Sequence, residues 1–453
     1  MSAVALSCSS IYDLVSPDSA EWVASLPSDL MFLILDKLFE STDHVRFAAV
    51  CKRWNSVAKE YNQQYSSSRT PFPMLMIPKK EKNSKEHREA AILYSVSEKK
   101  VYNNFRFQIP RYYLYRTMTE GIYSGAGQGW LARGVRNLSD EFNNFPKNNP
   151  SLRITLLNPF RSQWTSSIAL PRFPFPKRKD LFKLKVVLSA DPTLNRDNYV
   201  VILLCMRSMY SSKLAFVTGG RKYWTLPVGD CMFTDAIFYK GRGYAIAYRR
   251  TRYKVITFDV KGSSVPPEQA SYTGQWLHDH HVGTAYLVES TEGDLLYVRR
   301  HAKPKSCSTT DGGGLWGTEK FTVYKLTLND RSGSVVSLVE VKSIGDNALF
   351  LGSNSQSMSV SASKHPGCQP NCIYYTNDLV RLNWWLDDDI VVQLDTGIFN
   401  MEDKTIAQLC PQISLDEHGS PVWITPTFSD RSSNFDSTNA AFCDDYILRK
   451  ALH

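Results

Sequence analysis

The sequence predicts a mainly β protein that carries a small α-helical module near its N-terminus. Aromatic residues make up 12% of its 453 residues, and such residues favour pleated, half-buried strands. From about residue 91 onwards, short apolar or alternating runs are separated by Gly, Asp and Asn, which is typical of an all-β domain. Only residues 22–63 show apolar positions at helical spacing. The predicted organisation is a flexible tail at 1–20, the helical module at 21–64, a linker at 65–89 and the β domain at 90–445.

The bulk composition is that of a folded globular protein. Hydrophobic residues account for 43% and charged residues for 21% of the chain, and the length predicts two or three domains or one large repeat fold. The net charge of +9 is modest, and we interpret its small basic clusters as solvated loops, so a nucleic-acid partner is not expected. These clusters lie at residues 177–179, 249–252 and 299–300.

The sequence shows neither a membrane span nor a secretory signal. No apolar run approaches the ~18 residues that a membrane span needs, and residues 1–20 lack the basic start and apolar core of a signal peptide. The nine cysteines are mostly isolated along the chain, which is typical of a reducing compartment rather than of a disulfide scaffold. We therefore expect a cytoplasmic and/or nuclear protein without a membrane partner.

The helical module contains two clear helix starts. Pro27 and Ser28 supply the first, and the apolar run that follows them lasts about three turns. The second comes at residues 41–43, Ser-Thr-Asp, whose short polar side chains can accept the free backbone N–H groups of the next helix. Apolar residues then recur at three- and four-residue spacings from Val45 to Tyr61, which predicts an amphipathic helical stretch.

Several motifs are spaced along this module, and together they resemble a known family. They are Trp22, Leu26-Pro27-Ser28-Asp29-Leu30, Ile34-Leu35 with Leu38, Asp43-His44-Val45-Arg46, and Ala49-Val50-Cys51-Lys52-Arg53-Trp54. This pattern resembles the F-box, a three-helix module. The resemblance implies a Skp-type adaptor as the direct partner, and through it a cullin scaffold and a RING-bound ubiquitin-conjugating enzyme.

The first helix supports the same interpretation on physical grounds. Residues 30–35, Leu-Met-Phe-Leu-Ile-Leu, make it apolar on every side, and two short neighbouring helices cannot cover all of its faces. A partner protein is expected to supply the missing cover. Many F-boxes carry acidic residues where this sequence has Phe32 and Leu33, which predicts either a more apolar adaptor contact or docking onto the chain's own β domain. The residues predicted for the adaptor side, some as direct contacts and some as the core beneath them, are Leu26, Pro27, Leu30, Ile34, Leu35, Val50 and Trp54.

The predicted strands of the β domain fall into groups of about four. A spacing of roughly 45–55 residues between groups is the size of a propeller blade. The sequence therefore predicts a propeller-like domain of about five to seven blades, in which the two ends of the domain meet to close the ring. The groups lie near residues 122–170, 182–226, 233–258, 284–341 and 348–397.

Short phrases in the β domain carry a second resemblance. They are Gly129–Leu131, Leu156–Phe160, Asp235–Gly241, Tyr286–Ser290, Gly293–Arg299, Phe321–Leu326, Leu349–Gly352 and Asn371–Thr376. These phrases are similar to the plant F-box-linked family of unknown function, DUF 295 or KIB-like, over about residues 90 to 400. The resemblance implies a plant protein with a propeller-like domain, and it assigns no chemistry to that domain.

Candidate metal and catalytic groups are few. His365, Cys368 and Cys372 suggest zinc, but a structural site needs four ligands and no second pair stands at a suitable spacing. The histidines within 278–281 and the acidic run 387–389 are better explained as exposed loops. We therefore predict no catalytic residue, no metal and no cofactor.

Taken together, these features predict a non-catalytic substrate-receptor subunit of an SCF-type ubiquitin ligase, whose β domain binds an unidentified target protein. Trp276 and Trp316 lie in the longest predicted loops and are candidate anchors for that target, since aromatic residues bury much area for few rotatable bonds. The competing interpretation is that both pack back onto strand ends. Two alternative functions stay open: a stand-alone protein-binding propeller with a vestigial F-box, and an enzyme with acidic or His residues converging in the central channel.

Overall fold

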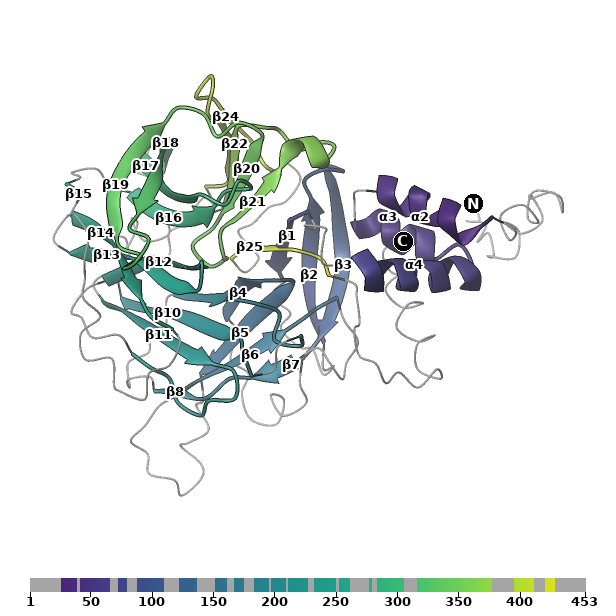
Figure 1. Ribbon diagram of the computed structural model, residues 1–453, viewed down its shortest axis with the longest axis horizontal. Helices are drawn as coiled ribbons and strands as arrows, with labels where there is room; N and C mark the ends of the chain where they lie inside the picture. Colours follow the sequence, from purple (N-terminus) through teal and green to yellow (C-terminus); the bar gives the residue numbers. More distant parts are fainter. Residues whose placement is uncertain are drawn as a thin grey trace, which may run out of the picture. The chain divides into compact units, whose positions relative to one another are not determined.

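Helices and strands are segregated along the chain in the computed structural model (Figure 1). The chain divides into a helical unit and a strand-rich unit that begins at Pro71. No helix in the described part of the chain is long and apolar enough to cross a membrane. The structure describes residues 26–38, 41–65, 72–79, 88–109, 122–136, 151–160, 167–174, 183–194, 197–208, 211–226, 232–249, 252–260, 277–278, 283–304, 316–376, 395–410 and 420–427.

The helical unit begins where the sequence predicts it. The backbone N–H groups of Leu30 and Met31 both donate to the Pro27 carbonyl at 3.1 Å, which fixes the first turn. Proline suits this position because its missing N–H group would have no partner inside the helix. The helices are α2 (Ser28–Lys37), α3 (Ser41–Ala48) and α4 (Lys52–Tyr65).

The described strands form six sheets that stand as blades around a common centre, a six-bladed β-propeller (Figure 1). The first blade contains β25 (Val422–Ile424), β1 (Met74–Pro78), β2 (Arg88–Ser95) and β3 (Lys100–Gln108). The second contains β4 (Ile122–Gly127), β5 (Trp130–Arg136), β6 (Ser151–Leu157), β7 (Ser167–Ala169) and β8 (Phe173–Pro174). The third contains β9 (Lys183–Leu188), β10 (Val200–Ser208) and β11 (Ser211–Thr218).

The remaining three blades complete the ring. The fourth contains β12 (Met232–Tyr239), β13 (Arg242–Arg249), β14 (Arg252–Phe258) and β15 (Leu277–His278). The fifth contains β16 (Gly283–Glu289), β17 (Leu295–Pro304), β18 (Trp316–Leu328) and β19 (Val335–Val341). The sixth contains β21 (Met358–Ser361), β20 (Asn347–Leu351), β22 (Cys372–Tyr375), β23 (Gly397–Asn400) and β24 (Ile406–Ala407) in that spatial order.

The first blade closes the ring with strands from both ends of the propeller unit. β25 pairs antiparallel with β1, and Trp423 lies opposite Leu75. The indole N–H of Trp423 donates to the Leu351 carbonyl of the sixth blade at 3.0 Å, so this buried side chain also joins the last blade to the first. The predicted ring closure is confirmed.

The β1 strand corrects the predicted linker at residues 65–89. Residues 74–78 form a strand whose side chains are all buried, although the prolines around them indicated a break. Proline is tolerated at strand ends, where it need not donate to the ladder. The five predicted strand groups each correspond to one blade, from the second to the sixth.

The hydrophobic core of the propeller lies between blades rather than in one central mass. Six clusters of buried side chains each join two neighbouring blades, and together they run around the whole ring. Trp130, for example, packs with Val201 of the third blade, and Phe258 packs with Val187 across the next junction. Because every blade is covered by its own neighbours, the ring needs no partner to bury its core.

Charged residues cross these junctions in the buried interior. Arg300 is 0% exposed, and its guanidinium donates to Thr318 Oγ1 at 2.7 Å, to the Thr376 carbonyl at 2.9 Å and to Asp395 Oδ2 at 2.6 Å. The interpretation of residues 299–300 as a solvated cluster is therefore wrong, because acceptors from the sixth blade pair with Arg300. Arg299 is also buried and lies over the Tyr253 ring, 4.3 Å from its centroid.

Candidate functional site

The helical unit has a small core. Its fully buried side chains are Met31, Leu35, Phe47, Val57, Ala58 and Tyr61. They come from all three helices, and a core of this size stabilises a domain of roughly 40 residues only weakly. The unit is therefore a poor candidate for independent stability.

Large apolar side chains of the same unit remain in water. Leu30 is 46%, Leu33 58% and Ile34 38% exposed on α2, and Val50 is 52% exposed between α3 and α4. Leu30 is separated from the other two by three and four residues, the spacing at which side chains share one side of a helix. The prediction that α2 is apolar on every side is confirmed, since Met31 and Leu35 are buried beneath this exposed side.

Polar contacts fix the geometry of the exposed face. The Arg53 guanidinium donates to the Leu26 carbonyl at 2.8 Å, which holds the first turn of α4 beside the start of α2. The rings of Phe47 and Trp54 pack with centroids 4.3 Å apart and join α3 to α4. These contacts place Val50 in a short turn between two anchored helices, so its exposed side chain has a defined position.

The predicted adaptor residues sort into two groups. Pro27, Leu30, Ile34 and Val50 are exposed and available for contact, whereas Leu35 is buried and Leu26 and Trp54 are half-buried against the core. This matches the expected mixture of contacts and supporting core. Their role in adaptor binding stays a prediction. We name the exposed set of Pro27, Leu30, Leu33, Ile34 and Val50 the α2 face.

Leu33 is a member of the α2 face that the sequence analysis did not select. At the two positions where many F-boxes are acidic, the structure separates the side chains. Phe32 turns inward and packs edge-on against Tyr61 with ring centroids 5.5 Å apart, while Leu33 points outward. Its three-residue spacing from Leu30 was the available signal for this outward position.

The structure describes only one of the two predicted target anchors. Trp276 lies outside the described residues. Trp316 is the first residue of β18, opposite Pro304 of β17, rather than part of a loop. Two residues further along β18, the Thr318 N–H and hydroxyl both donate to the buried Asp395 carboxylate.

The zinc candidates belong to the core between the sixth and first blades. Cys372 is buried at the start of β22, as predicted, and burial raises the pKa of its thiol to about 11. His365 is buried against the Phe72 ring, and burial lowers the pKa of its imidazole to about 4. Among the residues that the structure describes, no three His, Cys, Asp or Glu side chains are grouped to hold a metal. The runs 279–281 and 387–389 lie outside the described residues.

One carboxylate on an inner strand has a perturbed pKa. Asp235 of β12 is fully buried, and burial raises its pKa, against the opposing effects of Lys185 and of the Leu287 and Ala236 N–H groups. The Lys185 ammonium forms an ion pair with it, and the Leu287 N–H donates to it at 2.8 Å. These partners link the third, fourth and fifth blades. The arrangement is that of a structural junction, because the partners of this carboxylate come from the blades on either side of its own.

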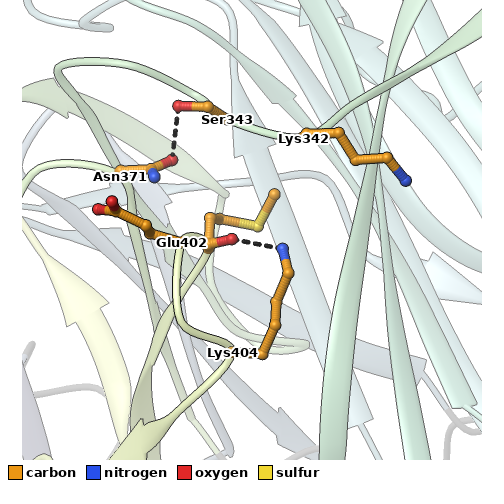
Figure 2. A pocket seen from close by; sticks show the side chains of 6 residues that line it. Lys342, Ser343, Asn371, Glu402 and Lys404 are labelled. Atoms are coloured by element: carbon orange, nitrogen blue, oxygen red, sulfur yellow. Dashed lines mark hydrogen bonds between the residues drawn. The ribbon is translucent and has the colours of Figure 1, made fainter.

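One shallow pocket of about 470 Å³ opens between the fifth and sixth blades (Figure 2). The Ser343 hydroxyl donates to Asn371 Oδ1 at 3.1 Å, and the Lys404 ammonium donates to the Met401 carbonyl. Glu402 and Lys342 complete the lining, and Lys342 extends away from Asn371 in Figure 2. Charged and polar groups dominate this surface, which is unlike the apolar lining of most small-molecule sites.

An exposed apolar face on a three-helix unit, followed in the same chain by a six-bladed propeller, defines the class of F-box proteins with a propeller domain. Residues 23–62 match the F-box-like family, and residues 93–400 match the KIB1-4 beta-propeller family. The second match covers more than half of the chain. The protein belongs to the KIB1-4 beta-propeller family.

Relatives with the same organisation occur in Arabidopsis thaliana. Putative F-box protein At1g65770 is 25% identical over 86% of this chain and 99% of its own length. F-box protein SKIP23 is 22% identical over 89% of this chain and 96% of its own length. F-box protein At4g35733 is 23% identical over 78% of this chain and 88% of its own length. These similarities support a non-catalytic F-box substrate-receptor role, and F-box domains in general bind Skp-type adaptors.

Proposed function

We propose that this protein is the substrate receptor of an SCF-type ubiquitin ligase. The F-box binds a Skp-type adaptor, which connects it to cullin and RING subunits, and the propeller binds the protein to be ubiquitylated. The α2 face carries this proposal, because Leu30, Leu33 and Ile34 are exposed on a unit that has too small a core to be independently stable.

The chemistry proposed for this chain is positioning. A bound target lysine and a ubiquitin-charged enzyme held in one assembly meet at a high effective concentration, without any catalytic group from the receptor. The propeller suits this task because its six blades form a closed, rigid ring. The ubiquitin transfer itself belongs to the RING-bound enzyme.

The adaptor interface can be tested by placing charges on the α2 face. Leu30→Glu with Ile34→Glu changes two exposed side chains, so the helical unit should still fold while adaptor binding falls by at least about 100-fold. Anchor residues near an interface centre commonly cost about 2 kcal/mol or more each. Lys59→Glu is a matched control, because it changes the net charge equally at an exposed position of α4.

The measurement is the affinity of the purified full chain for a purified Skp-type adaptor, with helical circular dichroism as the check on folding. Loss of binding in the double variant, with Lys59→Glu unchanged, supports the proposal. Equal adaptor binding by the double variant and the wild type would count against it. A wild-type chain that binds no adaptor would favour the stand-alone propeller module with a vestigial F-box.

We also propose that the protein works in the cytoplasm and/or the nucleus. The nine cysteines are mostly isolated along the chain, which supports a reducing compartment. Fluorescence microscopy of the tagged full chain tests this placement, and accumulation in the secretory pathway would contradict it.

A further inference from the structure

The outermost strands of the propeller blades differ in length and chemistry. β7, β15 and β24 span only two or three residues each, and β3 carries Lys100, Asn103 and Arg106 along its length. β19, at the outer side of the fifth blade (Figure 1), spans seven residues with the sequence Val-Val-Ser-Leu-Val-Glu-Val. Short or charged edge strands resist pairing with other chains, and β19 is neither short nor broken by charge before Glu340.

The side chains of β19 are unusually exposed for an apolar strand. Val336 is 60% and Val339 57% exposed, and the register with β18 shifts between Thr327 and Leu328, which places Val336 in a β-bulge and leaves residues 337–341 as the regular part of the strand. Strand β18 pairs with one edge of β19, and no strand among the described residues pairs with the other. Its free backbone N–H and C=O groups, flanked by β-branched side chains, form a template for an additional strand.

Basic residues gather at the end of this template. The Lys342 ammonium forms an ion pair with Glu340, and Lys342, Lys404 and Lys320 all help to hold the pKa of that carboxyl below its ordinary value. Lys342 and Lys404 also line the pocket between the fifth and sixth blades (Figure 2). The strand therefore runs from an apolar, exposed segment into a lysine-rich surface with a polar hollow.

We propose that the outer edge of β19 is the docking site for an extended segment of the target protein, which adds to the fifth blade as a further strand. Its apolar side chains cover Val336 and Val339, and an acidic residue at one end lies among Lys320, Lys342 and Lys404. The assignment of this segment to the target rests on the proposed function. The β19 edge as a docking site is inferred from its backbone groups and nearby charges, independently of that function.

Charge complementarity favours such a segment over a second copy of this chain. Antiparallel pairing of β19 with itself would bring the turn between β18 and β19 toward the lysines. That turn carries Asp330 and Arg331, whose charges cancel, so a second copy offers no acidic complement. An extended segment that ends in Asp or Glu offers such an acidic complement.

A library of phage-displayed twelve-residue peptides, selected on the full-length chain, tests this docking site. We expect enriched peptides to be rich in β-branched residues and to carry Asp or Glu near one end. A synthetic copy of an enriched peptide should lose at least tenfold in affinity when Val336→Lys and Val339→Lys are combined. Leu194→Lys with Tyr223→Lys, at exposed apolar positions around the third blade, is the matched control and should bind as the wild type does.

Two further arms separate strand addition from simple apolar binding. Two N-methylated peptides are compared, one methylated at its odd-numbered residues and one at its even-numbered residues. One of them should lose binding and the other should bind within about twofold of the unmodified peptide, because only every second N–H of an added strand faces β19. Lys342→Gln with Lys404→Gln should weaken the acid-ended peptide and not its amide-ended counterpart. Both variants are surface changes, and unchanged unfolding midpoints verify that they fold.

The proposal is overturned if no peptide is enriched, or if enriched peptides bind the Val336 and Val339 variant as tightly as the wild type. It is also overturned if the two N-methylated peptides bind equally. Dimerisation of the full chain that the same double variant abolishes would assign this edge to a second copy instead. Adaptor affinity is measured in parallel on the same variants and should stay unchanged. A wild-type chain that does not bind the adaptor would refute the proposed ligase role without affecting the peptide result.

Discussion

The helical unit and the propeller place their side chains in opposite ways. The helical unit leaves Leu30, Leu33 and Ile34 in water, whereas the propeller buries Arg300 and an ion pair between Lys185 and Asp235. In the propeller, each blade supplies cover and polar partners to its neighbours around a closed ring. Among the described residues of the helical unit, no such neighbour covers the α2 face.

This difference indicates which unit depends on another protein. Covering exposed apolar area yields about 25 cal/mol per Å², so an adaptor seated on the α2 face would stabilise the helical unit directly. The propeller has already covered its core, and its buried Lys185 and Arg300 form ion pairs with Asp235 and Asp395. We therefore expect the two units to respond differently to mutation, to pH and to an adaptor.

The largest expected effect breaks a buried ion pair of the propeller. Arg300→Met should lower the free energy of unfolding by about 3–5 kcal/mol, because it leaves the buried Asp395 carboxylate without its cation. Chemical denaturation followed by tryptophan fluorescence measures this. Lys325→Met is the control, since its pair with Asp294 is half-exposed and should contribute less than about 1 kcal/mol. Equal losses in the two variants would contradict the assigned burial.

The next effect should be confined to the helical unit. Leu35→Ala removes a fully buried side chain and should cost about 2–4 kcal/mol, enough to unfold this unit while the propeller remains intact. Leu33→Ala, two residues away and exposed, should change stability by less than about 0.5 kcal/mol. Hydrogen exchange resolves both units in one sample. Unfolding of the propeller by Leu35→Ala would show that the two units fold as one.

The propeller should also lose stability in mild acid through His365. Burial lowers the pKa of this imidazole from 6.5 to about 4, so below pH 6.5 the unfolded chain takes up a proton that the folded chain does not. Its contribution is complete above pH 6.5 and is lost as the pH falls toward 4, on the order of 3 kcal/mol. His365→Gln should flatten this part of the stability profile. An unchanged slope would show that His365 is not the responsible group.

The smallest effect concerns one hydrogen bond between blades. The Tyr244 hydroxyl of the fourth blade donates to the Gly333 carbonyl of the fifth at 2.9 Å in a buried position. Tyr244→Phe keeps the ring and removes this bond, so the expected loss is about 1 kcal/mol. Tyr223→Phe, at an exposed hydroxyl, serves as the control in the same denaturation experiment. A loss above about 3 kcal/mol would indicate that the ring itself has shifted.

Local patterns predicted the elements of this fold well. The start of α2 follows from Pro27 and Ser28, and the five strand groups follow from alternating runs and turn residues, because both signals lie within a few neighbouring positions. The motif around Leu26 and Trp54 likewise indicated the helical module. The number of blades was predicted only as a range, since β1 and β25 stand far apart in the sequence and form one sheet.

Long-range partners explain most of what the sequence did not reveal. Arg300 looked like a surface cation because its acceptor Asp395 lies 95 residues further along the chain. Trp316 was predicted to lie in a loop, because a stretch rich in Ser, Thr and Gly separates it in the sequence from Pro304, its partner on β17. Leu33 and Phe32 are neighbours on α2 that lie on different sides of the helix. Phe32 faces inward because it packs against Tyr61 of α4, a contact that neighbouring positions in the sequence do not reveal.

Hydrogen–deuterium exchange of the full chain, with and without a Skp-type adaptor, tests the central claim most directly. At an adaptor concentration 100 times its dissociation constant, binding adds about 2.7 kcal/mol to the stability of the unit that it contacts. We predict that amides of residues 28–37 exchange at least tenfold more slowly with the adaptor, while the propeller strands are unchanged. Unaltered exchange in α2, or protection confined to the propeller, would contradict the account.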